Sequence, residues 1–322
     1  MVRINDVPDK RDVYVWADFV ELLCITRQDG LVSQSDLLGR LRESRDILQT
    51  TDPGVTGADS EGSISGPWAT RLLAKDELLV GDIFKHLSYR EATLSSRYPF
   101  ELRSSRTSIQ MRRTVRRHDI YLFLLLAANL PFVARRWYSP ITRGFERIVA
   151  AGLQRWLPSA DVHIFGTSGH GTSRYSGQLF GKLNLLSQDL NERLLVTKED
   201  IYRGDVGDAG LDVVAWIGLG DLNSSRLVIL AQAACGADWV KKQPESGWEA
   251  WRSIIHFTAP HANVIAIPHF FRSSDGQWAT PRSIRSTVLI DRQRLMWLFR
   301  DFSPPVPRNT IDALLKSRKS LT

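Results

Sequence analysis

Two apolar runs separated by a short polar turn place the strongest limit on how this chain folds. Residues 211–219 read LDVVAWIGL, residues 226–234 read RLVILAQAA, and GDLNSS between them is typical of a turn. The pattern predicts a hairpin of two buried strands. Each run has a polar residue among its apolar ones, Asp212 in the first and Gln232 in the second. A polar group in a buried strand needs a partner, because its burial without one is costly.

The segments around this hairpin predict an α/β (α+β) domain over residues 135–322, with a mixed sheet flanked by helices. Apolar spacing indicates a helix at 141–157, a strand at 160–166 and a helix at 177–195 ahead of the hairpin. Behind the hairpin, the pattern predicts a helix at 247–257, strands at 263–269 and 285–290, and a helix at 291–302.

Residues 1–134 are predicted to form a mainly α-helical domain without a strand-rich core. Helical spacing covers 13–49 and 68–94, whereas 50–67 is dominated by Gly, Ser, Thr, Asp and Pro and predicts a mobile loop. The run YLFLLLAANLPFV at 121–133 is the longest apolar stretch, but a membrane span needs about 20 residues. It therefore predicts a buried core helix, and we expect no membrane association.

Charge and cysteine content narrow the class of partner and compartment. Lys and Arg number 42 against 35 Asp and Glu, and the net charge of +7 favours anionic partners such as nucleic acid. The two cysteines, Cys24 and Cys235, are too few for a disulfide framework or a Cys-type zinc site. The N-terminus has no apolar stretch after its charges, so we expect no secretory signal and a cytoplasmic protein.

The order of elements and their acidic residues resembles the PD-(D/E)xK, or restriction-endonuclease-like, nuclease superfamily. The segment GFERIVAAGLQRWL resembles the first-helix motif with Glu146, and GDAGLDVVAW resembles the strand that carries the family's Asp, here Asp212. The segment LVILAQAACG lies where the family has (D/E/Q)-x-K, with Gln232 as its first residue. The resemblance covers about the last 190 residues, and the order and spacing of the three motifs together carry it.

The resemblance implies a metal-dependent nuclease in which Glu146, Asp212 and Gln232 hold Mg²⁺ or Mn²⁺. Such an ion prefers hard oxygen ligands, activates a water and neutralises charge that develops on the phosphate. The family's lysine is replaced by Ala234. Lys241 and Lys242 follow in the same run, and we expect one of them to supply the missing ammonium if the chain folds back after the strand.

Each of these residues also has a purely structural interpretation. Glu146 and Arg143 have the spacing of an ion pair on one helix, Asp212 is compatible with a satisfied turn acid, and Lys241 and Lys242 with a solvated pair. If these interpretations hold, the alternative is a catalytically degenerate nuclease fold that binds nucleic acid or a partner protein without cutting. The absence of a lysine at 234 favours that alternative.

An arginine run in the N-terminal domain predicts a surface for phosphates. Residues 103–117 hold six arginines and no acid, and Arg112, Arg113, Arg116 and Arg117 are the densest part. A solvated face or a protein interface is the structural alternative. Arg113 and His118 also match the R-x4-6-H motif of the HEPN ribonucleases, a spacing that arises easily by chance in such a run. Arg174, after a glycine-rich segment, is a further candidate for contact with a nucleic-acid backbone.

The overall layout resembles bacterial defence-island proteins, through its helical front, the Tyr98–Phe100 turn and a third strand with Gln followed by Cys. The resemblance implies an effector in defence against phage or plasmids, with DNA as the expected substrate. The chain has no ATPase or methyltransferase motif, so we expect a partner protein in a defence complex to supply sensing or specificity. A homo-oligomer is compatible with the sequence.

Overall fold

The computed structural model describes residues 1–2, 4, 6–9, 11–51, 67–166, 174–201, 207–302, 304 and 306–317. The chain divides into two compact units: unit 1 contains residues 1–135, 271–279 and 309–322, and unit 2 contains residues 136–270 and 280–308. The sequence assigned all of 135–322 to one domain, whereas two of its segments pack into unit 1. A single domain boundary in the sequence cannot describe a fold in which the later segments 271–279 and 309–322 belong to unit 1. The predicted loop at 50–67 falls almost wholly outside the described residues.

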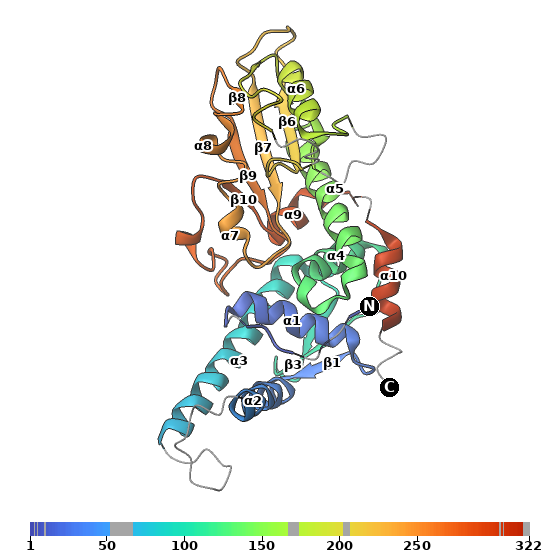
Figure 1. The fold of residues 1–322 in the computed structure, drawn as a ribbon. Helices are drawn as coiled ribbons and strands as arrows, with labels where there is room; N and C mark the ends of the chain where they lie inside the picture. The colour runs from blue at the N-terminus through green and yellow to red at the C-terminus, as the bar shows by residue number, and fades with distance from the viewer. Residues whose placement is uncertain are drawn as a thin grey trace. The chain divides into compact units, whose positions relative to one another are not determined.

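Unit 1 combines helices with a small sheet (Figure 1). Its helices are α1 (Val13–Thr26), α2 (Gln34–Thr51), α3 (Pro67–Leu94), α4 (Asp119–Ala128) and the larger part of α10 (Arg308–Ser317). Its antiparallel sheet has the order β1-β3-β2, with β1 at Leu31–Ser33, β2 at Phe100–Arg103 and β3 at Ser108–Met111.

This sheet adds three short strands to a region that the sequence predicted to be mainly α-helical. The strands β2 and β3 are four residues long, and part of the arginine run joins them through Ser104, Ser105 and Arg106, all with positive φ. Such short strands carry too little alternation to be recognised, and they form because β3 pairs on both sides, with β1 and β2.

The apolar helix predicted near 121–133 is confirmed as a core helix. Every residue of α4 from Ile120 to Ala128 is buried. The helix ends at Asn129, whose side-chain amide donates to the backbone oxygen of Leu125 over 2.9 Å, and Pro131 follows in a short 3₁₀ turn. Within the described residues, no helix has both the length and the apolar character that crossing a bilayer requires.

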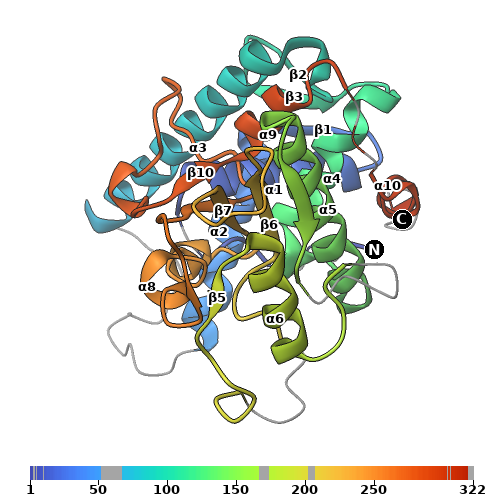
Figure 2. The ribbon, with the colours of Figure 1, turned by 90° about the horizontal axis from the view of Figure 1, so that it is seen from above.

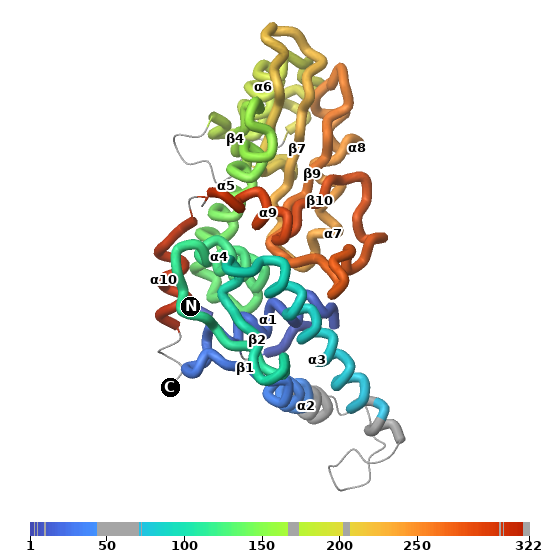
Figure 3. The backbone as a smooth tube through the Cα atoms, turned by 180° about the vertical axis from the view of Figure 1, so that it is seen from behind, coloured from blue at the N-terminus to red at the C-terminus, as the bar shows by residue number. Residues whose placement is uncertain are grey.

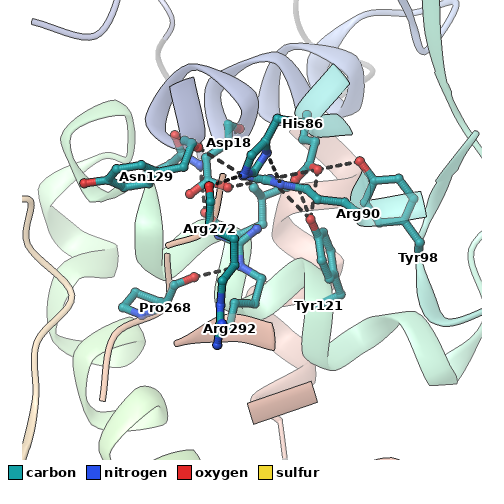
Figure 4. Close-up of polar contacts among 12 residues, drawn as sticks. Asp18, His86, Arg90, Tyr98, Tyr121, Asn129, Pro268, Arg272 and Arg292 are labelled. Carbon is teal, nitrogen blue, oxygen red and sulfur yellow. Dashed lines mark hydrogen bonds and ion pairs between the residues drawn. The ribbon is translucent and has the colours of Figure 1, made fainter. Parts of the chain in front are cut away.

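Arg90 of α3 links the helices of unit 1 through buried charges (Figure 4). Its Nη1 lies 2.7 Å from Asp18 Oδ1 and 2.9 Å from Glu21 Oε1, and all three side chains are at most 1% exposed. The hydroxyls of Tyr98 and Tyr121 donate to Glu21 over 2.6 and 2.8 Å. The opposite charges and the hydrogen bonds offset the cost of burying these groups, so the cluster joins α1, α3 and α4.

Replacing Arg90 should strongly destabilise unit 1, because two carboxylates would then be buried without their cation. We expect Arg90→Met to lower the free energy of unfolding by about 3–5 kcal/mol, measured by urea denaturation. The control is Arg116→Ala on an exposed arginine, which should change stability by about 0.5 kcal/mol or less. Equal effects of the two substitutions would contradict a structural role for the cluster.

Unit 2 is built on a five-stranded mixed sheet in the order β10-β9-β7-β6-β4. The strands are β4 (Asp161–Ile164), β6 (Val213–Ile217), β7 (Leu227–Ala233), β9 (Ala262–Ala266) and β10 (Val288–Ile290). The pairs β4–β6 and β6–β7 are antiparallel, and the pairs β7–β9 and β9–β10 are parallel. Seen from behind, β4 lies at one side of this sheet and β10 at the other (Figure 3).

Helices of unit 2 lie on both sides of the central strands. They are α5 (Tyr138–Trp156), α6 (Leu179–Leu190), α7 (Trp239–Lys242), α8 (Trp248–Trp251) and α9 (Arg292–Leu298). α5 contacts β4, β6 and β7, and the view in Figure 2 places α5 and α8 on opposite sides of β6 and β7. A buried cluster that includes Leu183, Leu230 and Trp251 fills the space between α6, the sheet and α8.

The hairpin predicted from the two apolar runs is confirmed. β6 and β7 pair antiparallel from Val213 opposite Ala231 to Ile217 opposite Leu227. The helix predicted at 247–257 is wrong beyond its first turn: α8 ends at Trp251, and Ile255–His256 form β8, which pairs with β5 (Arg193–Leu194). The spacing of Trp248 and Trp251 indicates one helical turn, but it does not show where the helix ends or that Ile255 lies in a strand.

Candidate functional site

The amphipathic helix α5 carries Glu146 on its buried side. Ile141, Phe145, Val149 and Leu153 on this helix are fully or almost fully buried, and Glu146 is only 8% exposed. A carboxylate at such a position loses most of its hydration. Arg143 and Arg147 on the same helix lower the pKa of Glu146, but burial and nearby acids outweigh them.

Asp212 precedes β6 and faces the same point as Glu146, beside Gly166. A methyl group added at Gly166 would lie 3.2 Å from Asp212 Oδ1 and 3.4 Å from Glu146 Oε2. The backbone N–H groups of Phe165 and Gly166 donate to the Asp212 carbonyl over 2.8 and 3.1 Å. These bonds hold the end of β4 against the start of β6, and the missing side chain at Gly166 leaves space between the two carboxylates.

Burial and neighbouring acids raise the pKa of both carboxyl groups. Burial, then the charges of Asp212 and Asp208, raise the pKa of Glu146 to about 8. Burial raises the pKa of Asp212 to about 6, with Asp208 and Glu245 adding to this, while the N–H of Ala233 at 2.7 Å and the charge of Lys242 oppose it. Asp208 lies in the turn before Asp212, where its Oδ1 accepts from the N–H of Gly210 over 2.9 Å. The site thus gathers acidic groups in a poorly hydrated place, where the neutral form of Glu146 is favoured at neutral pH.

These pKa values predict a fall in stability with rising pH in buffer that contains EDTA. Because both folded-state values exceed the ordinary 4.5 for Glu and 3.8 for Asp, the folded state binds more protons between these values and about 8. The free energy of unfolding should therefore decrease across this range. Glu146→Gln removes most of the effect and should exceed the parent in stability by on the order of 2 kcal/mol at pH 9, but not at pH 4.

Denaturant unfolding at a series of pH values measures this difference. The control is Glu199→Gln at an exposed position of unit 2, which should follow the parental profile. Parallel profiles for the parent and Glu146→Gln would show that the Glu146 pKa is ordinary.

Gln232 lies in β7, where its side chain is only 3% exposed. Its Nε2 donates to the backbone oxygen of Gly210 over 3.2 Å and to Glu245 Oε2. Its Oε1 is buried and accepts no hydrogen bond within the described part of the chain. Burying an amide oxygen without a hydrogen-bond donor costs free energy, unless another group or an ion interacts with it.

The two candidate lysines occupy different surroundings. Both are exposed at the end of α7, the helix that follows β7. Lys242 is the one whose charge acts on Asp212 and on the buried thiol of Cys235. Ala234, at the family's lysine position, is fully buried.

Gly166, Asp208 and Glu245 were not among the site residues predicted from the sequence. Gly166 lies two residues after β4, and a glycine at such a position is one sign that another group approaches closely. Glu245 follows the two lysines in KKQPES and gave no comparable signal, because its contact with Gln232 depends on how the chain turns after α7. Asp205, another acid of the same region, lies outside the described residues.

The side chains near Gly166 can be tested against the ligands that a divalent cation prefers. No three His, Cys, Asp or Glu side chains within the described ranges are grouped so that they alone would hold a metal. The candidate donors are the carboxylates of Glu146 and Asp212 at Gly166, and Oε1 of Gln232, which is unpaired as far as the structure describes the chain. The neighbour of Gln232, Ala233, donates its N–H to Asp212 Oδ2. Hard oxygen donors of this kind suit Mg²⁺ or Mn²⁺, which keep several waters and need few protein ligands.

The predicted nucleic-acid contacts are spread over both units. In unit 1, Arg113, Arg116 and Arg117 are exposed, whereas Arg112 lies 2.9 Å from Glu91. In unit 2, Arg174 forms an ion pair with Asp189. These four arginines and Arg174 remain predicted contacts.

His118 of the HEPN-like motif is 3% exposed, and its Nε2 lies 3.1 Å from the Ser96 carbonyl. Burial lowers its pKa. This position holds the imidazole inside the fold of unit 1 and gives it a structural role.

Comparison with protein-family models, with curated proteins and with solved structures finds no match for this chain.

Proposed function

We propose that unit 2 is a restriction-endonuclease-like domain that hydrolyses phosphodiester bonds of nucleic acid with Mg²⁺ or Mn²⁺. The observation that carries this proposal is the meeting of Glu146 and Asp212 at Gly166, next to a strand whose Gln232 Oε1 has no hydrogen-bond partner among the described residues. The order helix, strand, hairpin, parallel strand in α5, β4, β6, β7 and β9 supports the finer fold assignment.

A bound divalent cation would supply Lewis acidity and a water of lowered pKa. Glu146, Asp212 and Gln232 would hold it, and Gly166 keeps the space between the carboxylates free of a side chain. Lys242 places a positive charge near Asp212. We assign to Lys242 the stabilisation of negative charge on the phosphate, which in this family comes from the position that Ala234 occupies.

A second candidate is a nuclease fold that binds nucleic acid or a partner protein without cutting it. The buried Ala234 favours this candidate, because no ammonium can come from that position. In either case we propose a defence complex as the setting, with DNA as the ligand and a partner protein that supplies sensing.

The decisive experiment measures cleavage of single- and double-stranded DNA and RNA by the full chain with Mg²⁺ or Mn²⁺. Asp212→Asn should abolish cleavage. Lys242→Ala should lower the rate by about 100-fold or more if its charge acts on the transition state. Lys241→Ala is the matched control, since it removes a neighbouring exposed ammonium, and it should leave the rate close to the parental value.

The outcomes separate the two candidates. A parent that cleaves none of these substrates supports the binding function, and a folded Asp212→Asn variant with parental activity contradicts the site. Equal loss of activity in the two lysine variants would contradict the role of Lys242.

The exposed arginines of unit 1 should add affinity that depends on salt and not on sequence. Replacing Arg113, Arg116 and Arg117 by Ala should weaken duplex binding and reduce the slope of log K against log salt by up to about 3. The control removes the same charge from Arg282, Arg285 and Arg300, which are exposed in unit 2. Equal slopes for the parent and the unit 1 variant would assign the run to solvent or to a protein interface.

A further inference from the structure

The side chain of Glu245 makes a specific contact that the cation site itself does not require. Its Oε2 accepts a hydrogen bond from Nε2 of Gln232, and the second acceptor for the same nitrogen is the carbonyl of Gly210 at 3.2 Å. Both hydrogens of the amide nitrogen therefore have acceptors, and a carboxylate has none to donate. The contact therefore fixes the orientation of the amide, with Nε2 towards Glu245 and Oε1 away from it.

The backbone around Glu245 is arranged to bring it to this place. Its N–H donates to the Lys242 carbonyl over 3.0 Å, and its own carbonyl accepts from Nε1 of the fully buried Trp251 over 3.0 Å. Gly210 has φ +74°, and a methyl group there would lie 2.7 Å from the Cβ of Glu245. The close approach of Glu245 to the Asp208–Asp212 turn thus depends on a glycine at 210.

We propose that Glu245 is a positioning residue that fixes the amide of Gln232 so that Oε1 serves as a neutral ligand for the cation held by Glu146 and Asp212. This inference rests on the proposed function and goes further, because it explains why an amide and not a carboxylate stands at position 232. An acid there would face Glu245 with no hydrogen between the two groups, whereas glutamine supplies one.

Mn²⁺ binding to the full chain, measured by calorimetry, tests the proposal with two variants at one position. Glu245→Ala and Glu245→Gln both remove the negative charge, but only the second keeps an oxygen that accepts from Gln232. Glu245→Ala should therefore bind Mn²⁺ about 10-fold or more weakly than Glu245→Gln. Glu249→Ala, which removes an exposed carboxylate from α8, should bind like the parent.

A double-mutant cycle in EDTA tests the contact without the metal. Gln232→Glu should destabilise the fold, and adding Glu245→Gln should restore much of the loss, because the amide introduced at position 245 can then donate to the carboxylate introduced at position 232. Additive effects of the two substitutions would overturn the contact and the proposal with it.

Asp212→Asn distinguishes failure of this inference from failure of the proposed function. If Asp212→Asn loses Mn²⁺ binding while Glu245→Ala and Glu245→Gln bind equally, the cation site stands and the positioning role is overturned. A parent that does not bind Mn²⁺, or an Asp212→Asn variant that binds it as the parent does, overturns both.

Discussion

The meeting of two buried carboxylates, Glu146 and Asp212, is the constraint on which unit 2 depends most. Burial and neighbouring acids raise the pKa of both groups, and their ionisation in the folded protein costs stability. The fold maintains it through α5 packed across β4, β6 and β7, and through backbone bonds from Phe165 and Gly166 to Asp212. Acidic groups with pKa values raised by burial and by neighbouring acids are the basis on which we propose a cation site here.

The buried charges of unit 1 show the opposite arrangement. Arg90 meets Asp18 and Glu21 within 3 Å, and two tyrosine hydroxyls donate to Glu21. Attraction and hydrogen bonds there oppose the cost of desolvation, so the cluster stabilises the packing of α1, α3 and α4. Groups of opposite sign join the helices of unit 1, whereas in unit 2 two acidic groups lie close together at Gly166.

Much of unit 2 could be predicted because its signals are local. The apolar runs that became β6 and β7 are bounded by turn residues, and the helical spacing of α5 is strong, so Asp212, Gln232 and Glu146 stood out as polar residues in apolar surroundings. Short elements could not be predicted in this way. The strands β2 and β3 hold four residues each, and α8 is a single turn followed by a strand, so their form depends on the segments they pair with.

The sequence by itself determined the hairpin, the core helix α4 and the residues that carry carboxylate and amide oxygens, because periodicity and polarity act over neighbouring residues. Only the tertiary structure decided that Glu146 and Asp212 meet at Gly166, that Lys242 and not Lys241 acts on Asp212, and that Glu245 accepts a hydrogen bond from Gln232. These contacts and charge effects involve residues that are 13 to 66 positions apart in the sequence, and one of them distinguishes between two adjacent lysines. They depend on how strands and turns pack against one another, and the local spacing of residues in the sequence does not determine that packing.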